Sequence, residues 1–259
     1  MKSWLLALVL AGCASTGVSP EVRKDVAPTG KLRVAINLGN PALAKRDDKG
    51  AVSGITIDLG RGLAQRLGAE FDPVLYPNVG GLVEGAKAGA WDIGFAAIDP
   101  TRADTLEFTA PYMEVSVSLL VPAGSAIQAL ADADRAGMRI GVGTRNAADL
   151  FLTRNLKQAE LVRTADNLDA AVDLLRAGRA DVYATNREGL LNLRDRLPGY
   201  RIVDNRFYAV EHAIALPRGR QAGLAFASAY VEELKRSGEV AKAIERNALR
   251  GVEVAPPAK

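Results

Sequence analysis

The 259-residue chain contains only one cysteine and one histidine. Structural zinc sites draw most of their ligands from these two residue types, so we expect no such site and no metal or other cofactor. A serine or cysteine nucleophile activated by histidine would have to use His212, and the chain has no Gly-x-Ser-x-Gly motif. We therefore interpret His212 as a packed or hydrogen-bonded residue rather than a catalytic one.

Neither sign of charge predominates in the sequence. Lys and Arg number 33 against 30 Asp and Glu, and the two signs are interspersed, which argues against a nucleic-acid partner. With 48% hydrophobic and 24% charged residues the composition is that of an ordinary globular protein. The length allows one large domain or two modest ones, and both can bury a core without disulfides.

The apolar stretch near the N-terminus, Trp4–Leu10, is too short to span a bilayer. It follows a basic residue and precedes small ones, the order typical of an export signal. The Leu-Ala-Gly-Cys sequence ending at Cys13 resembles the bacterial lipobox, whose cysteine is acylated and becomes the first mature residue. We predict a lipoprotein signal peptide over 1–12, a lipid anchor at Cys13 and a flexible tether over 13–30. An ordinary signal peptide with a chance cysteine, or an incorrect start site, remain alternatives.

From residue 31 onward, apolar runs of strand length alternate with segments of helical period. This alternation predicts an α/β fold with mainly parallel sheets flanked by helices. The expected strands are 32–37, 71–76, 93–97, 139–143, 160–164 and 182–185, and the expected helices are 56–67, 81–90, 147–156, 168–177, 188–197, 222–237 and 239–249.

Two long β-rich segments, 113–124 and 206–219, interrupt this alternation. They flank the second strand-and-helix series, so we expect them to carry the chain to a second lobe and back as a hinge. The C-terminal helices would then pack on the first lobe. The predicted division is lobe 1 from 31–117 and 211–259, and lobe 2 from 118–210.

Several motifs together resemble the family 3 extracellular solute-binding proteins of ABC importers over about residues 31 to 250. The matching segments are GITIDLGRGLAQRLGAE (54–70), GLVEGAKAGAWDIGFAA (81–97), TRADTLEFTAPY (101–112), RIGVGT (139–144) and LLRAGRADVYATN (174–186). The resemblance implies a two-lobed type II periplasmic-binding-protein fold with a two-strand hinge. It also implies capture of a small-molecule ligand between the lobes, no enzymatic activity, and an ABC permease as partner.

The most specific motif contains Arg102, ten residues before Tyr112. In the family, an arginine at this place binds a ligand carboxylate, to which its planar guanidinium offers paired donors. A surface ion pair of Arg102 with Asp99 or Asp104 is the alternative. The resemblance also implies a ligand contact at Thr144, next to Arg145 at a helix N-terminus that favours anions. Thr144 or Asn146 could instead only cap that helix.

Two departures from the family pattern narrow the ligand. Asn186 stands where amino-acid-binding members carry an acidic residue for the ligand ammonium, and the usual aromatic sandwich is missing. We therefore expect a small carboxylate or other polar solute rather than a standard L-amino acid. Asn37, Asn40 and Asp99 are secondary candidate contacts, although Asn-Pro and Asp-Pro pairs also form turns.

Two other functions fit the same sequence. Cyclohexadienyl dehydratases resemble this family and act on dicarboxylates, and they would need a general acid, for which Asp99 or Glu188 is the candidate. A ligand-sensing envelope protein would serve a receptor instead of a transporter. We expect a monomer in the periplasm or cell envelope, held to the membrane surface through Cys13.

Overall fold

The computed structural model describes residues 17–258, so the predicted signal peptide and Cys13 lie outside the described residues. The helices are α1 (Pro20–Val26), α2 (Ile55–Leu67), α3 (Val79–Lys87), α4 (Leu130–Ala133), α5 (Ala147–Asn155), α6 (Leu168–Arg176), α7 (Arg187–Arg196), α8 (Gln221–Arg236), α9 (Glu239–Arg246) and a 3₁₀ turn, η1 (Pro100–Arg102). The strands are β1 (Lys31–Asn37), β2 (Lys45–Arg46), β3 (Val52–Ser53), β4 (Glu70–Tyr76), β5 (Ile93–Ala97), β6 (Leu106–Phe108), β7 (Met113–Pro122), β8 (Arg139–Gly143), β9 (Glu160–Thr164), β10 (Val182–Asn186), β11 (Tyr200–Ile202), β12 (Tyr208–Pro217) and β13 (Val252–Val254).

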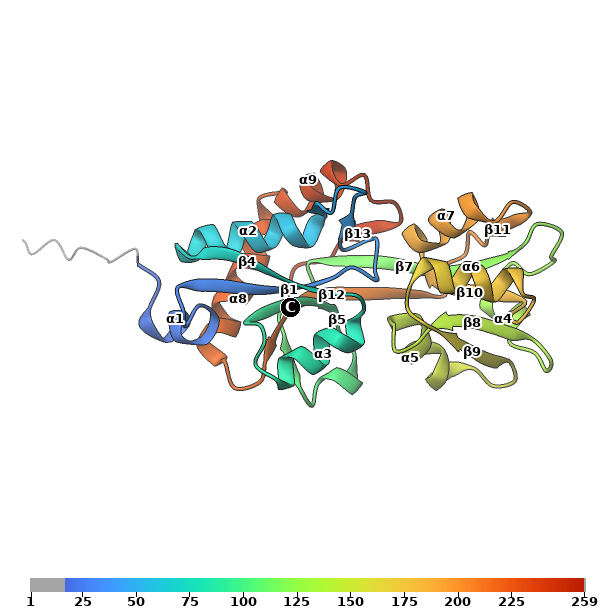
Figure 1. Ribbon diagram of the computed structural model, residues 1–259, viewed down its shortest axis with the longest axis horizontal. Coiled ribbons are helices and arrows are strands. Elements are labelled where there is room, and N and C mark those ends of the chain that lie inside the picture. The colour runs from blue at the N-terminus through green and yellow to red at the C-terminus, as the bar shows by residue number, and fades with distance from the viewer. Residues whose placement is uncertain (1–16, 259) are drawn as a thin grey trace, which may run out of the picture.

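The main sheet runs from one end of the molecule to the other in the order β4-β1-β5-β12-β7-β10-β8-β9 (Figure 1). Strands β1, β4 and β5 are parallel, as are β8, β9 and β10, whereas β7 and β12 are antiparallel to each other. We call the elements around β1, β4 and β5 lobe one and those around β8, β9 and β10 lobe two. The two-lobed α/β fold expected from the sequence is confirmed.

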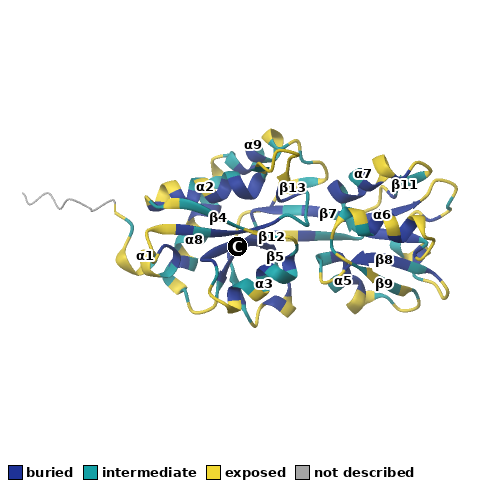
Figure 2. Cartoon of the chain, in the orientation of Figure 1, coloured by how far each residue is buried: buried dark blue, intermediate teal, exposed yellow. Residues whose placement is uncertain are grey.

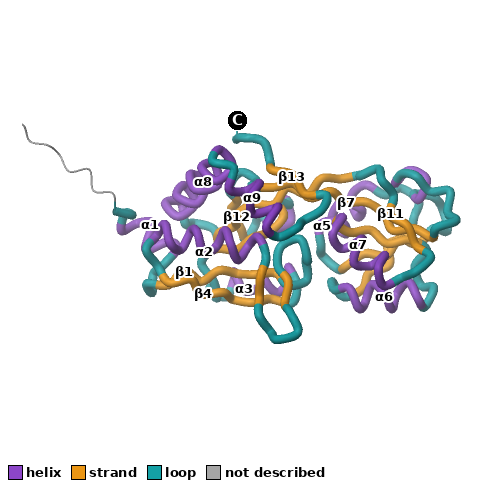
Figure 3. Tube along the Cα trace, turned by 90° about the horizontal axis from the view of Figure 1, so that it is seen from above, coloured by secondary structure: helices purple, strands orange, loops and turns teal. Residues whose placement is uncertain are grey.

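The long strands β7 and β12 join the two lobes at the centre of the molecule, as the view from above also shows (Figure 3). Both coincide with the two segments that interrupt the strand-and-helix alternation in the sequence. In β12, Ile214 opposes Phe95 of lobe one, whereas Tyr208 opposes Val117 of β7. The chain therefore crosses between the lobes twice along paired strands.

Helices cover both faces of the sheet in each lobe, which leaves its central strands buried (Figure 2). In lobe one, α2, α8 and α9 bury their apolar side chains in the largest core cluster, and α3 packs in a separate cluster around Trp91. In lobe two, α5 contributes to the largest cluster, whereas α6 and α7 form a third one around Leu174. Strand β1 accordingly carries a continuous buried run on both faces, as expected for a parallel sheet.

The predicted flexible tether over 13–30 is wrong for part of its length, because α1 occupies residues 20–26. Ser19 caps this helix by accepting a hydrogen bond from the backbone of Val22, and Pro20 provides the fixed φ that suits a first turn. Val26 is buried, and Asp25 accepts a hydrogen bond from the start of α8. These contacts with a distant segment cannot be read from the local composition.

None of the helices within residues 17–258 combines the length and apolar character needed to cross a membrane.

Candidate functional site

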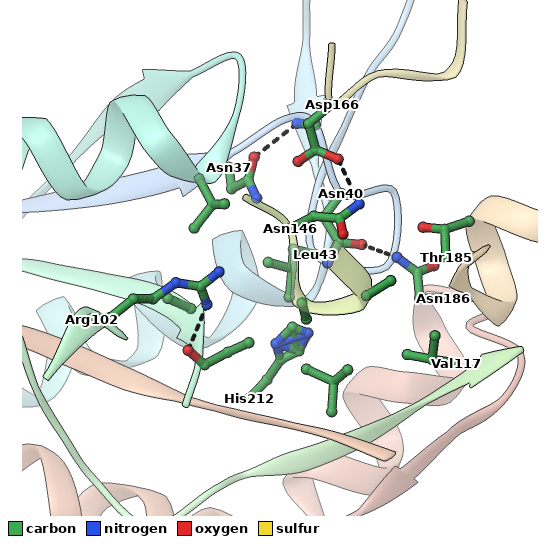
Figure 4. Close-up of a pocket in the computed structure, with 17 residues that line it drawn as sticks. Asn37, Asn40, Leu43, Arg102, Val117, Asn146, Asp166, Thr185, Asn186 and His212 are labelled. Carbon is green, nitrogen blue, oxygen red and sulfur yellow. Dashed lines mark hydrogen bonds between the residues drawn. The ribbon is translucent and has the colours of Figure 1, made fainter. Parts of the chain in front are cut away.

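A cavity between the two lobes lies where the parallel strands end (Figure 4). The carboxyl ends of β1, β5, β8, β9 and β10 converge there, which is the usual place for a ligand in an open α/β sheet. Its volume is about 50 Å³. Its polar lining consists of Asn37, Asn40, Arg102, Asn146, Asp166, Thr185, Asn186 and His212.

Arg102 reaches the cavity from the short η1 turn after β5. Asp99 caps this turn by accepting a hydrogen bond from the backbone N–H of Thr101, so the Asp-Pro pair is a turn former as well as a neighbour of the site. Arg102 is 5% exposed, and its guanidinium donates to the carbonyl oxygens of Ala97 (2.7 Å) and Arg145 (3.1 Å). Burial lowers its pKa. Arg102 forms no ion pair with Asp99 or Asp104, so the alternative of a surface ion pair is wrong.

Asp166 is the acidic group of the cavity, and it was not predicted from the sequence. It follows β9 and accepts a hydrogen bond of 3.0 Å from the side-chain amide of Asn146. Burial raises its pKa to about 6, although the Asn146 hydrogen bond and the charge of Arg102 act in the opposite direction. A Cβ at Gly143 would collide with its carboxylate, so only glycine leaves room for this side chain.

Three further asparagines, Asn37, Asn40 and Asn186, line the cavity. Asn186 caps α7 by accepting from the backbone of Gly189 and donates its amide to the side chain of Asn40 across the lobes, at 2.9 Å. Asn37 accepts from the backbone of Gly39 and turns its amide nitrogen toward the cavity (Figure 4). Each asparagine is thus a turn or cap residue that also faces the cavity.

His212 lies on β12 at the floor of the cavity and is 3% exposed. Burial, reinforced by the charge of Arg102, lowers its pKa to about 3, so the imidazole is neutral at physiological pH. Its Nδ1 is buried without a hydrogen-bond partner among the described residues. The sequence-based interpretation of a packed residue agrees with this burial.

The rest of the lining is small and apolar. It comprises Leu43, Val79, Ala96, Ala97, Val117, Ala147, Ala148 and Val210 with Gly39, and it includes no aromatic side chain. The cavity therefore offers close contact to a compact solute rather than a stacking surface.

Of the seven residues predicted as ligand contacts, Asn37, Asn40, Arg102 and Asn186 line the cavity, and three others do not. The Thr144 hydroxyl turns away and donates to the carbonyl oxygen of Thr164 at 2.8 Å. Arg145 is exposed, with a φ of 62°, and contributes only its carbonyl oxygen to Arg102. Asn146, not Thr144, caps α5.

Asp99 is also occupied elsewhere. Its carboxylate pairs with Arg154 of lobe two at 3.0 Å. Burial alone would raise its pKa, but the hydrogen bonds from Thr101 and Arg154 lower it overall. Asp99 therefore contributes to the contact between the lobes and not to the lining of the cavity.

A second ion pair, between Lys45 and Glu188, also joins the lobes. Glu188 is buried at the start of α7, and its carboxylate accepts a hydrogen bond of 3.2 Å from Lys45 of lobe one. Arg250, next to β13, lies 3.7 Å from the other carboxylate oxygen. Together with the Asp99–Arg154 pair, these contacts hold the lobes in a closed arrangement.

Asp166 could have been found from its place at the end of a predicted strand. The residues placed correctly at the cavity, such as Asn37 and Asn186, stand at the carboxyl ends of parallel strands. Asp166 stands two residues after the predicted strand 160–164, at the same edge of the same sheet. A charged residue just after a parallel strand is itself a signal of a ligand contact, and it can be recognised without reference to a family pattern.

Comparison with known proteins supports this fold. Residues 32–248 match the model of the bacterial extracellular solute-binding proteins, family 3. A probable histidine-binding protein of Neisseria gonorrhoeae is 25% identical over 93% of this chain and 94% of its own. A cyclohexadienyl dehydratase of Pseudomonas aeruginosa is 25% identical over 70% of this chain and 69% of its own. The solute receptor for L-cysteine of Neisseria gonorrhoeae superposes with a TM-score of 0.74 at 22% identity, covering 85% of this chain and 90% of that one. Because the family model covers most of the sequence, this chain belongs to the family 3 extracellular solute-binding proteins.

Proposed function

We propose that this protein captures a compact amino acid, or a similar small zwitterion, between its lobes and delivers it to an ABC-type permease. The observation that carries the proposal is the presence of Arg102 and Asp166, one charge of each sign, in the lining of one small cavity. A zwitterion supplies the two opposite charges. The neutral Asn186 argued against an amino acid, but Asp166 provides the missing carboxylate from the end of β9, which β8 separates from β10.

In this proposal the guanidinium of Arg102 binds the ligand carboxylate and Asp166 binds its ammonium. Two of the five guanidinium donors are engaged by backbone oxygens, which leaves donors for a carboxylate. The amide nitrogen of Asn37 adds a donor nearby. The short apolar lining favours a small side chain on the ligand.

The ligand would act by favouring the closed arrangement. Arg102 belongs to lobe one and Asp166 to lobe two, so a bound zwitterion connects the lobes and shifts their equilibrium. We retain 31–117 with 211–259 as lobe 1 and 118–210 as lobe 2. The borders fall within β7 and β12, the strands that would bend on opening.

Export and anchoring remain part of the proposal. Cys13 would carry the lipid and keep the protein at the membrane surface of the cell envelope, beside its permease. A sensor role would use the same cleft; an adjacent permease and ATPase in the genome favour transport, and a neighbouring sensor kinase favours signalling.

A thermal-shift screen followed by calorimetry tests the proposed ligand class, because a ligand of the native state raises apparent stability. The panel comprises amino acids, carboxylates without an amine, sugars and polyamines. We expect small amino acids to give the largest shifts and Arg102→Gln to abolish them. Arg135→Gln is the matched control, because Arg135 is exposed and engages no carboxylate among the described residues. Shifts from sugars or polyamines alone would contradict the proposal.

Asp166 also supports a second candidate function, that of a dehydratase. Asp99 and Glu188, the acids considered for that chemistry, are engaged in ion pairs and do not line the cavity. Asp166 does line it, and a pKa near 6 suits a general acid at neutral pH. Turnover of prephenate or arogenate by the wild type that Asp166→Asn abolishes would identify an enzyme; binding of amino acids without turnover favours the solute-binding role.

A further inference from the structure

A second concave site lies on the opposite face of the central strand β7. Val117 of this strand lines the ligand cavity, whereas its neighbours Ser116 and Ser118 line a groove of about 400 Å³. Successive side chains of a strand point to opposite faces of a sheet, so the two sites are separated by the sheet itself. They share no lining residue. We call this site the arginine groove, after Arg187, Arg206 and Arg250 in its lining.

The three guanidiniums are incompletely neutralised. Their nearest carboxylates are Asp204 for Arg187 (3.6 Å), Glu253 for Arg206 (3.7 Å) and Glu188 for Arg250 (3.7 Å). These separations are too long for hydrogen bonds, and no guanidinium of the groove donates one to any group in residues 17–258. Glu188 is also shared with Lys45. The groove therefore gathers three arginines that form only long ion pairs and donate no side-chain hydrogen bond within the described residues, and Asp204 is the carboxylate in its lining.

The backbone holds these arginines in place around the groove. The N–H of Ser116 donates to the carbonyl oxygen of Gly251, which ties the segment of Arg250 to β7. The hydroxyl of Ser118 lies 2.6 Å from the carbonyl oxygen of Val203 and 3.0 Å from that of Asn205, which ties down the loop before Arg206. The arrangement is thus built on the central strand and not on loose surface side chains.

Arg187 is placed by contact with the C-terminal segment. A Cβ at Gly251 would lie 2.5 Å from the Cβ and Cγ of Arg187, and Gly251 has a φ of 69°. Only glycine at this position allows the close approach. Arg187 begins α7 of lobe two, whereas Arg250 precedes β13 beside lobe one, so the groove spans the two lobes on the side away from the cavity.

We infer that the arginine groove binds an oxyanion of the phosphate class, held by Arg187, Arg206 and Arg250 together. Arginine matches a phosphate group with paired donors, and three such side chains around one concave site can surround a multivalent anion. Because Arg187 and Arg250 come from different lobes, the bound anion favours the closed arrangement. By thermodynamic reciprocity it raises the affinity of the cavity for its own ligand.

Titration calorimetry of the full chain with inorganic pyrophosphate, at about 0.15 M salt to screen nonspecific attraction, tests this inference. We expect saturable binding that weakens about tenfold or more in Arg206→Gln and in Arg187→Gln. Arg135→Gln removes the same charge elsewhere on lobe two and should leave binding unchanged. Absence of saturable binding up to about 10 mM, or equal weakening in Arg135→Gln, overturns the inference.

Two further experiments distinguish the groove from the cavity and identify the source of the phosphate. Arg102→Gln should abolish binding in the cavity and leave pyrophosphate binding intact; loss of both would show that pyrophosphate occupies the cavity and refute the groove. Flotation with phosphatidylglycerol vesicles compares a lipid headgroup with a free anion. If the wild type floats with the vesicles and Arg206→Gln does not, the phosphate belongs to a lipid headgroup. If the wild type and Arg206→Gln float equally and the wild type binds pyrophosphate, the phosphate belongs to a free anion.

Discussion

Replacing Asp166 with asparagine should change stability and ligand affinity in opposite directions. The folded protein raises the pKa of this carboxyl from 3.8 to about 6, chiefly by burial. One pKa unit corresponds to about 1.4 kcal/mol, so the ionised carboxylate costs the ligand-free protein up to about 3 kcal/mol at pH 7. Asparagine keeps an oxygen for the amide of Asn146 and carries no charge. We therefore expect Asp166→Asn to increase the free energy of unfolding by up to that amount.

The pH dependence supplies the sign of the effect. Between about pH 4 and pH 6 the folded state holds a proton that the unfolded state releases, so the wild type loses stability as the pH rises through this window. The gain from Asp166→Asn should thus be largest at pH 7 and vanish below about pH 4. Urea denaturation followed by circular dichroism at several pH values measures it. Asp173→Asn, on an exposed face of α6, is the matched control and should have little effect at any pH.

Ligand affinity should respond in the other direction. Removing one partner of a buried charge pair costs about 2 kcal/mol or more, which lowers affinity for an amino acid by about thirtyfold or more. In the wild type, affinity should also fall as the pH is lowered through about 6, because Asp166 takes up a proton. Calorimetry at pH 7 and pH 5 measures both effects. A variant that is less stable at pH 7, or that binds amino acids as tightly as the wild type, would refute the reasoning.

Two other substitutions test the closed arrangement. Glu188→Gln removes the buried carboxylate that pairs with Lys45, so ligand-free protein should show a larger radius of gyration in X-ray scattering, whereas the exposed control Glu84→Gln should not. Gly39→Ala would place a Cβ 2.8 Å from the carbonyl oxygen of Asp166 in lobe two and 2.7 Å from that of Pro77 in lobe one, so ligand affinity should fall about tenfold and the melting temperature of the ligand-free protein should fall as well. Gly124→Ala, where nothing lies within 4 Å, should bind normally.

The sequence was sufficient to predict the order of the longer helices and strands from residue 31 onward, because each of them carries its own local pattern. Gly68, for example, ends α2 in a left-handed conformation, as its position after a leucine repeat indicates. The predicted helix 222–237 is α8 displaced by one residue. What failed was the prediction of segments whose structure depends on a remote partner, such as α1, whose buried Val26 packs beside Gly223 of α8.

In the candidate site, too, some side chains were predicted from the sequence and others were not. Arg102 and Asn186 were predicted from motifs, and both line the cavity. Thr144 lies in the expected loop, but its hydroxyl donates a hydrogen bond to the carbonyl oxygen of Thr164. The spacing of residues in a motif does not reveal which way such a side chain turns. Asp166 was missed because the family pattern directed attention to Asn186, although the two residues lie at the ends of strands in one sheet.

The burial and the hydrogen bonds of Arg102 explain how a ligand could bind without breaking the existing contacts of the site. Burial lowers the pKa of this guanidinium, which means that its charge is less well stabilised than in water. The carbonyl oxygens of Ala97 and Arg145 accept two of its hydrogen bonds but bring no negative charge. Asp166 attracts it but is itself near its own pKa at neutral pH. A ligand carboxylate would relieve this deficit using the remaining donors, and an ammonium would do the same for Asp166. Arg102 and Asp166 are each buried without full compensation of their charge in the closed cavity. Both charges are compensated together only by a ligand that carries a carboxylate and an ammonium on one molecule.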